Sequence, residues 1–122
     1  MVLVDTSVWI RFLANRAPFA GRLDGLLGQG EVGGHDFVFG ELLIGDKGGR
    51  KQLLASYELM HYAPVVPHRD VVEFVRQRRL HGRGIGWIDT HLLASALVSH
   101  MTLWTADPRL GDVARELGIE YE

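Results

Sequence analysis

The residues best suited to chemistry are four acids beside apolar runs: Asp5, Glu41, Asp89 and Asp107. Two of them end apolar runs, one opens an apolar helical segment, and one lies within such a segment. A carboxylate in that setting needs a partner, because burying an unpaired charge costs several kcal/mol. Mg²⁺ or Mn²⁺ is the simplest shared partner, since both prefer oxygen ligands. Together the four acids predict a metal site.

Each acid also has an ordinary structural interpretation when it is taken alone. Asp5 and Asp107 can cap the helices that follow them, and Pro108 suits the first position of a helix. Asp89 can complement a helix dipole. Glu41 can be a solvated side chain. The functional interpretation therefore rests on the four acids occurring together.

The hydrophobic pattern predicts strands that alternate with helices. Strands are predicted at residues 2–4, 31–34, 62–66, 101–105 and 119–121, and helices at residues 7–13, 18–27, 36–44, 51–59, 69–80, 87–100 and 108–117. Such alternation favours a parallel sheet covered by helices on both faces. Asp5 and Asp107 then follow the carboxyl ends of two strands, where ligands bind in these folds.

Composition limits the remaining possibilities. A chain of 122 residues, 47% of them apolar, is expected to form one domain over residues 1–122. The absence of cysteine excludes disulfides and thiolate metal sites and fits a reducing compartment. No signal peptide and no stretch of roughly 20 apolar residues is visible, so we expect a cytoplasmic protein without membrane contact.

Charge gives only a local indication of a nucleic-acid partner. The formal net charge is -2, but basic side chains cluster just before Asp89: Arg76, Arg78, Arg79, His81 and Arg83. This stretch is either a solvated helix face or a phosphate-binding surface. The glycines at 82, 84 and 86 follow a helical segment, so they do not predict a dinucleotide site. A GxSxG nucleophile elbow is also absent.

Four segments in order along the chain resemble those of the PIN-domain nucleases, and most closely the VapC toxins of prokaryotic toxin–antitoxin pairs. They are VDTSVWI (residues 4–10), ELLIG (41–45), GIGWIDTHLLASA (84–96) and WTAD (104–107). No single segment is specific, but together they extend over almost the whole chain. Pro108 and Arg109 follow the last acid, where many relatives carry further acidic or asparagine residues, so the number of bound metal ions stays open.

The resemblance implies a three-layer α/β fold, with a parallel sheet of about five strands flanked by helices. It implies a Mg²⁺- or Mn²⁺-dependent endoribonuclease, a homodimer and a cognate antitoxin. Its implied site residues are Asp5, Glu41, Asp89 and Asp107, with Ser7 and Thr105 as hydroxyl neighbours. From their position before Asp89 we further expect Arg79 and Arg83 to contact RNA phosphates.

Two other functions remain open from the sequence. A metal-dependent phosphatase would require an aspartate at position 7, where Ser7 stands. A catalytically inactive RNA-binding PIN module would not require acids at all four positions. Turnover of RNA against turnover of a small phosphoester separates the three possibilities. The sequence leaves open whether the RNA is a tRNA, an rRNA loop or an mRNA.

Overall fold

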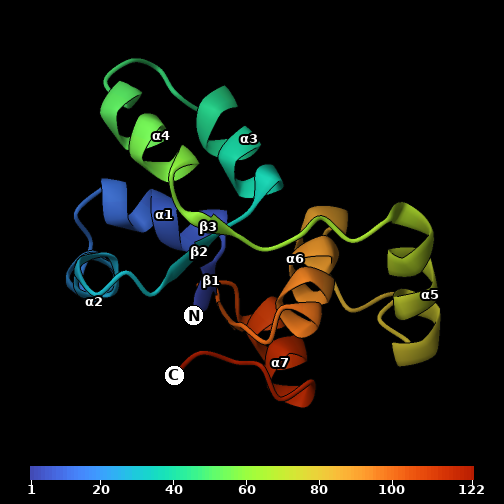
Figure 1. The fold of residues 1–122 in the computed structure, drawn as a ribbon. Coiled ribbons are helices and arrows are strands. Elements are labelled where there is room, and N and C mark those ends of the chain that lie inside the picture. Colours follow the sequence, from blue (N-terminus) through green and yellow to red (C-terminus); the bar gives the residue numbers. More distant parts are fainter.

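The computed structural model describes residues 1–122 and shows one parallel sheet flanked by helices (Figure 1). Its strands are β1 (Val2–Val4), β2 (Val32–Gly34), β3 (His61–Tyr62) and β4 (Thr102–Trp104), in the order β3-β2-β1-β4. All three neighbouring pairs are parallel. The predicted α/β architecture is therefore confirmed.

Seven helices surround this sheet. They are α1 (Thr6–Leu13), α2 (Phe19–Gly28), α3 (Asp36–Ile44), α4 (Lys51–Glu58), α5 (His68–Arg78), α6 (Trp87–Val98) and α7 (Pro108–Glu116). In Figure 1, α1 and α2 lie on one side of the strands, and α6 and α7 on the other. Helices α3 and α4 pack as a pair, and α5 packs on α6. None of these seven helices has the length and apolar character of a membrane-spanning segment.

The fifth predicted strand, at residues 119–121, is present only as one bridge between Leu103 and Glu120. The predicted strand at 62–66 is also shorter, because Pro64 and Pro67 cannot donate to a sheet ladder. Two predicted helices end early, since Arg79 and His100 adopt left-handed backbone conformations at φ 55° and 57°. "About five strands" is thus an approximation for a sheet of four.

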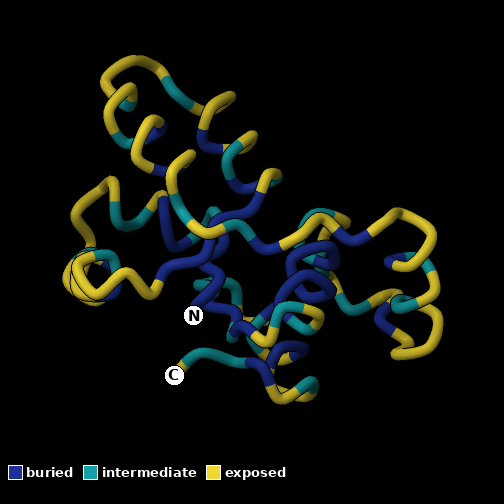
Figure 2. The backbone as a smooth tube through the Cα atoms, viewed as in Figure 1, coloured by how far each residue is buried: buried dark blue, intermediate teal, exposed yellow.

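The core lies between the sheet and its helices, with β1, β2, β4 and α6 among its most buried segments (Figure 2). Leu3 and Val4 are fully buried because helices cover both faces of the central strand. The two glycines of β2 allow a close approach of neighbours. A Cβ at Gly33 would lie 2.7 Å from Sδ of Met101, and one at Gly34 would lie 2.9 Å from the Tyr62 ring.

Three aromatic residues near α1 and α3 pack against the core and do not form an exposed patch. Trp9 is fully buried and packs edge-on against Phe12 and Tyr57. Phe12 and Phe39 are partly buried against the same core. The indole of Trp9 therefore serves the packing of α1 and is not available to a homodimer surface.

Candidate active site

Asp5 lies at the junction between β1 and α1 and is the most buried of the four acids, with 4% of its surface exposed. Its backbone N–H donates to the carbonyl of Trp104 at the end of β4. Its Oδ1 accepts from Ser7 Oγ at 2.5 Å and from Val8 N at 3.3 Å, which caps α1. Asp5 therefore caps α1, as its structural interpretation predicts. This capping role does not exclude a second role in a functional site.

Burial raises the pKa of the Asp5 carboxyl above its ordinary value. The hydroxyls of Ser7 and Thr105 and the N–H of Val8 act in the opposite direction, because they stabilise the ionised form. The negative charge of Asp89 raises the pKa further. The charge of Asp89 is the smallest of these influences on the pKa of Asp5, and it places Asp89 within electrostatic range of Asp5.

The two predicted hydroxyl neighbours connect the ends of β1 and β4. Ser7 Oγ lies 3.4 Å from Thr105 Oγ1 and accepts from the N–H of Ala106 at 3.0 Å. Thr105 Oγ1 accepts from the N–H of Asp107 at 3.0 Å. A continuous set of polar contacts thus extends from Asp5 to the backbone of Asp107, as expected for residues at neighbouring strand ends.

Glu41 joins this group through a residue that the sequence analysis did not assign to the site. Thr6 Oγ1 donates to Glu41 Oε1 at 2.6 Å, which connects the start of α1 with the middle of α3. Thr6 directly follows Asp5, so this contact brings Glu41 to the same end of the sheet. No sequence pattern pairs the two residues, because they lie 35 positions apart.

Asp89 and Asp107 both stabilise the first turn of a helix. Asp89 Oδ2 accepts from the N–H of Gly86 at 3.0 Å, and Asp107 Oδ1 accepts from the N–H of Arg109 at 2.9 Å. Each of these carboxylates, like Glu41, uses only one of its two oxygens in the hydrogen bonds of the chain. The other oxygen of each is available to a ligand.

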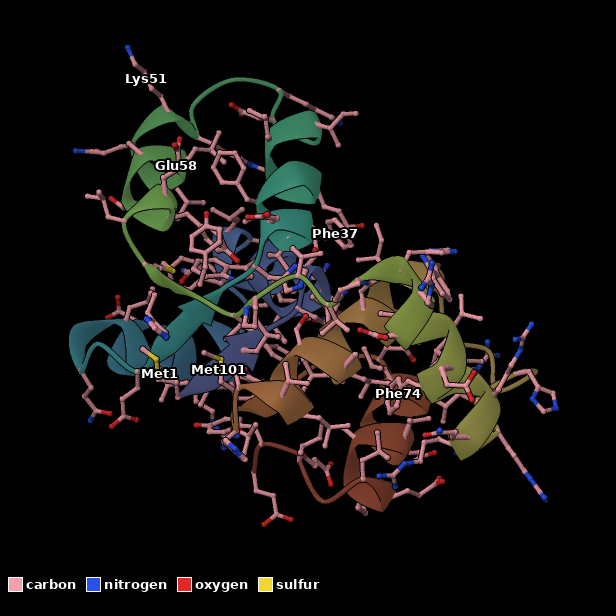
Figure 3. The ribbon with its side chains drawn as sticks, turned by 45° about the vertical axis from the view of Figure 1, so that its right-hand side comes forward. Met1, Phe37, Lys51, Glu58, Phe74 and Met101 are labelled. Atoms are coloured by element: carbon pink, nitrogen blue, oxygen red, sulfur yellow. The ribbon has the colours of Figure 1, made fainter.

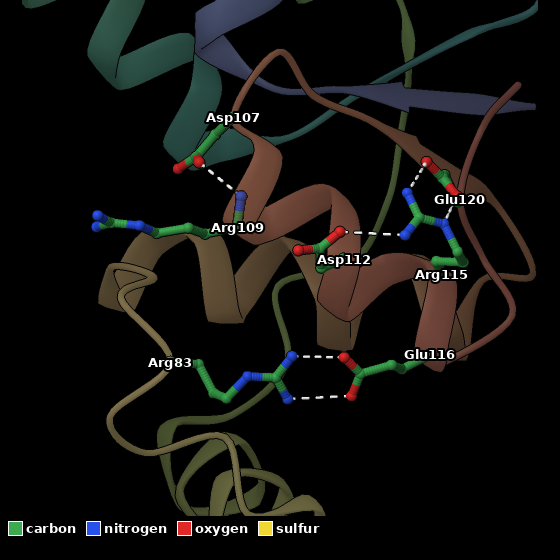
Figure 4. A network of polar contacts seen from close by, with 7 residues as sticks. All are labelled: Arg83, Asp107, Arg109, Asp112, Arg115, Glu116 and Glu120. Carbon is green, nitrogen blue, oxygen red and sulfur yellow. Dashed lines mark hydrogen bonds and ion pairs between the residues drawn. The ribbon is translucent and has the colours of Figure 1, made fainter.

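None of the four acids forms an ion pair. The ion pairs of the chain are Arg83–Glu116, Arg115–Asp112 and Arg115–Glu120, all on the surface around α7 (Figure 4). No three histidine, aspartate or glutamate side chains converge closely enough to hold a metal ion. The acids thus occupy one end of the sheet without forming a compact cage. Their chemistry still fits a hard cation, because Asp5 and Asp89 repel each other and lack a basic partner.

Comparison with known proteins identifies the family. A family model described as "PIN domain" matches residues 2–116. The chain belongs to the PIN domain family. It is also 46% identical over 120 residues to "Ribonuclease VapC32" of Mycobacterium tuberculosis strains CDC 1551 / Oshkosh and ATCC 25618 / H37Rv. Each match covers 98% of this chain and 94% of the relative. The resemblance to VapC-type PIN nucleases is thereby confirmed.

The two predicted phosphate-binding arginines of this PIN domain differ in their surroundings. Arg83 donates to both carboxylate oxygens of Glu116 on α7, at 3.0 and 2.5 Å (Figure 4). Arg79 is exposed at the left-handed end of α5. Neither forms an ion pair with the four acids. Arg83 would therefore have to share its guanidinium between Glu116 and a phosphate, or exchange Glu116 for the phosphate, if it contacts RNA.

The loop between α5 and α6 depends on a glycine next to Arg83. Gly84 adopts φ +79°, and a Cβ there would lie 2.8 Å from Cδ of Arg109. Only glycine tolerates this conformation and this close approach without strain. The glycine-rich stretch of this PIN domain thus forms a tight turn against α7.

A buried histidine that the sequence analysis left unassigned connects the helices that carry the acids. His35 Nδ1 accepts from the N–H of Phe37 at 3.0 Å and caps α3, while Nε2 lies 2.9 Å from Ser95 Oγ on α6. The backbone N–H of His35 donates to Tyr57 Oη on α4 at 3.0 Å. Because Nδ1 accepts, Nε2 carries the proton and donates to Ser95. His35 thus holds the helix of Glu41 against the helix of Asp89.

We expect this contact to make the fold sensitive to acid. Burial lowers the pKa of His35 to about 4, from an ordinary value of 6.5. Between these values the unfolded chain binds the proton and the folded chain does not, so stability is lost as pH falls from about 6.5 towards about 4. The loss attributable to His35 approaches ~3 kcal/mol at the acid end. Urea unfolding at pH 7 and pH 5 measures it.

His35→Asn is the informative variant, because asparagine keeps a capping acceptor but does not titrate. It should be less stable than the wild type at pH 7 and should lose less stability at pH 5. His100→Asn is the matched control at an exposed histidine with φ 57°, a conformation that asparagine tolerates. Equal acid sensitivity in the wild type and in His35→Asn would contradict the assignment of this loss of stability to His35.

Proposed function

We propose that this PIN domain is a metal-dependent endoribonuclease and the toxin of a toxin–antitoxin pair. The observation that carries the proposal is the buried Asp5, which has a raised pKa, lies near Asp89 and lacks a basic partner. A divalent cation would relieve that repulsion. The relatives named ribonucleases support RNA as the substrate. A phosphatase is less consistent with Ser7, whose hydroxyl supports Asp5.

The residues of the site have different proposed roles. Asp5 would be the central ligand, with Asp89, Asp107 and Glu41 completing the set directly or through water. A Mg²⁺ or Mn²⁺ ion held by these residues would supply an activated water and polarise the phosphoryl oxygen. Ser7 and Thr105 hold Asp5 ionised and oriented. The free oxygen of Glu41 is suited to accept a proton from the attacking water, because Glu41 is the exposed member of the four.

Removal of the cation is the direct test. Excess EDTA should stop RNA cleavage, and Mg²⁺ or Mn²⁺ should restore it. The same cations should raise the melting temperature of the wild type, which reports binding independently of turnover. Full cleavage in EDTA would exclude the metal mechanism. Hydrolysis of p-nitrophenyl phosphate without cleavage of RNA would favour the phosphatase, and cation binding with neither reaction would favour the inactive module.

The RNA surface is proposed to include Arg79 and Arg83. Each lost phosphate contact should reduce the slope of log affinity against log salt by roughly one unit. Gel-shift titrations of Arg79→Ala and Arg83→Ala at several salt concentrations measure this slope. An unchanged slope would mean that both side chains belong to a solvated surface and do not contact RNA phosphates.

We further propose a homodimer and an antitoxin partner, both acting in the cytoplasm, where the RNA substrates lie. The exposed apolar side chains at Ile10, Leu43 and Leu59 are available to a dimer interface. Light scattering reports the dimer directly, since one chain has a mass of 13.6 kDa. Fractionation of cells that express the protein tests its location.

A further inference from the structure

An open apolar groove of about 630 Å³ is lined by Glu41 and by the start of the helix that carries Asp89. Its walls come from α3, from the segment that leads into α5, and from the first turns of α6. Phe37 projects from α3 on this side of the molecule (Figure 3). A groove of this size next to a candidate nuclease site is large enough to bind part of a substrate.

The groove contains an exposed aromatic face. Trp87 is 44% exposed, the most of the three tryptophans, while Trp9 and Trp104 are buried. The rings of His68 and His91 hold the indole in place, with centroid distances of 5.4 and 5.2 Å. An exposed and immobilised indole is the kind of surface on which unpaired bases stack.

The groove is continuous with the candidate active site. Glu41, which accepts from Thr6, lines it, and so does Ile88, the residue before Asp89. Trp87, Ile88 and Asp89 are the first three residues of α6. A group seated in the groove therefore lies next to a phosphate held at the acids.

The charge of the groove selects the part of RNA that can enter. Its lining includes the carboxylates of Asp36 and Glu41 and no lysine or arginine, so it repels a phosphodiester backbone. Carboxylates accept hydrogen bonds from amino and imino groups of bases. The folded chain also leaves Nδ1 of His91 buried without a hydrogen-bond partner, an arrangement that a polar ligand can relieve.

We propose that this groove binds one unpaired base of the substrate RNA, stacked on Trp87, with Asp36 accepting from the donor edge of the base. Guanine presents two adjacent donors to a carboxylate, whereas uracil presents a single N–H between two carbonyl oxygens, so the groove favours guanine. The choice of polymer rests on the proposed ribonuclease function. The recognition of a base does not, because it can be measured without cleavage.

The first test uses nucleosides and the full chain without divalent cations. Guanosine should shift the indole N–H signal of Trp87 in a nitrogen–proton NMR spectrum, in a saturable way, and uridine should do so more weakly. Trp87→Phe assigns that signal, and Asp36→Asn should remove most of the preference for guanosine. Ribose 5-phosphate should cause no shift. An apolar peptide is added in a parallel titration. The proposal is overturned if no nucleoside shifts the Trp87 signal, or if only the apolar peptide shifts it.

The second test uses cleavage. Trp87→Ala should raise KM for single-stranded RNA about tenfold or more and broaden the choice of cleavage site, while kcat changes little. Trp87→Phe should restore much of the selectivity, since it restores an aromatic face. Val98→Ala, which truncates an exposed apolar side chain at the other end of α6, is the matched control. An unchanged KM and site choice in Trp87→Ala would overturn the base site.

The two proposals can fail separately. A shift of the Trp87 signal by guanosine together with no metal-dependent RNA cleavage would keep the base site and reject the ribonuclease. Metal-dependent cleavage with no effect of nucleosides or of Trp87→Ala would keep the ribonuclease and reject the base site.

Discussion

Asp5→Asn should abolish RNA cleavage and at the same time stabilise the metal-free protein at pH 7. Asparagine retains the oxygen that caps α1, so the helix start is preserved. It removes a carboxylate whose charge burial disfavours, as the raised pKa of Asp5 indicates. Initial rates should fall by orders of magnitude, and the melting temperature should rise.

The gain in stability should depend on pH. A carboxyl whose pKa is raised by folding binds its proton more tightly in the folded state. The wild type therefore loses stability as pH rises from the ordinary value of 3.8 through the folded pKa of Asp5. The difference in melting temperature should be small at the acid end of this window and fully developed above it. Scans from pH 4 to pH 8 without metal measure it.

Two comparisons sharpen this prediction. Asp24→Asn removes an exposed acid of α2 and should change neither the rate nor the melting temperature. Mn²⁺ should raise the melting temperature of the wild type and of Asp24→Asn but not that of Asp5→Asn. A destabilised Asp5→Asn would mean that the carboxylate serves chiefly as a cap, and retained activity would remove Asp5 from the site.

Local chemistry explains why most elements were predictable from the sequence. The Val2–Val4 strand, the caps at Asp5 and Asp107, and the helix starting at Trp87 all depend on neighbours within a few residues. The errors occur where tertiary contacts decide. Residues 119–121 form one bridge instead of a strand. The strand predicted at 31–34 did form, as β2, but the close contacts of its glycines with Met101 and Tyr62 could not be read from the sequence.

The candidate site was predictable to a lesser degree. The four acids could be grouped because two of them follow strand ends, which meet at one edge of a parallel sheet. The Thr6–Glu41 contact joins residues 35 positions apart, and the His35–Ser95 contact joins residues 60 positions apart. No local sequence pattern indicates either contact. Arg83 was expected to face a phosphate, but its nearest anion is Glu116, which the sequence places 33 residues away.

Complete inhibition by a small partner protein is the second large effect that we expect. Because Asp5 and Asp89 lack a basic partner, an arginine from such a protein can take the place of the cation between them. Charge-assisted hydrogen bonds from a guanidinium would fit the free carboxylate oxygens. Co-expression with the product of the neighbouring reading frame should yield a complex that does not cleave RNA.

The charge of Asp5 decides whether this mechanism is correct. Asp5→Asn should bind the partner more weakly than the wild type does, whereas Asp24→Asn should bind it equally well. Adding Mn²⁺ should weaken binding to the wild type, since the cation and the arginine compete for the same oxygens. A partner that binds Asp5→Asn as tightly as the wild type, or that inhibits fully after its arginines are replaced by alanine, acts somewhere other than on the acids. In that case the unpaired carboxylates of Asp5 and Asp89 would be assigned to the proposed cation alone.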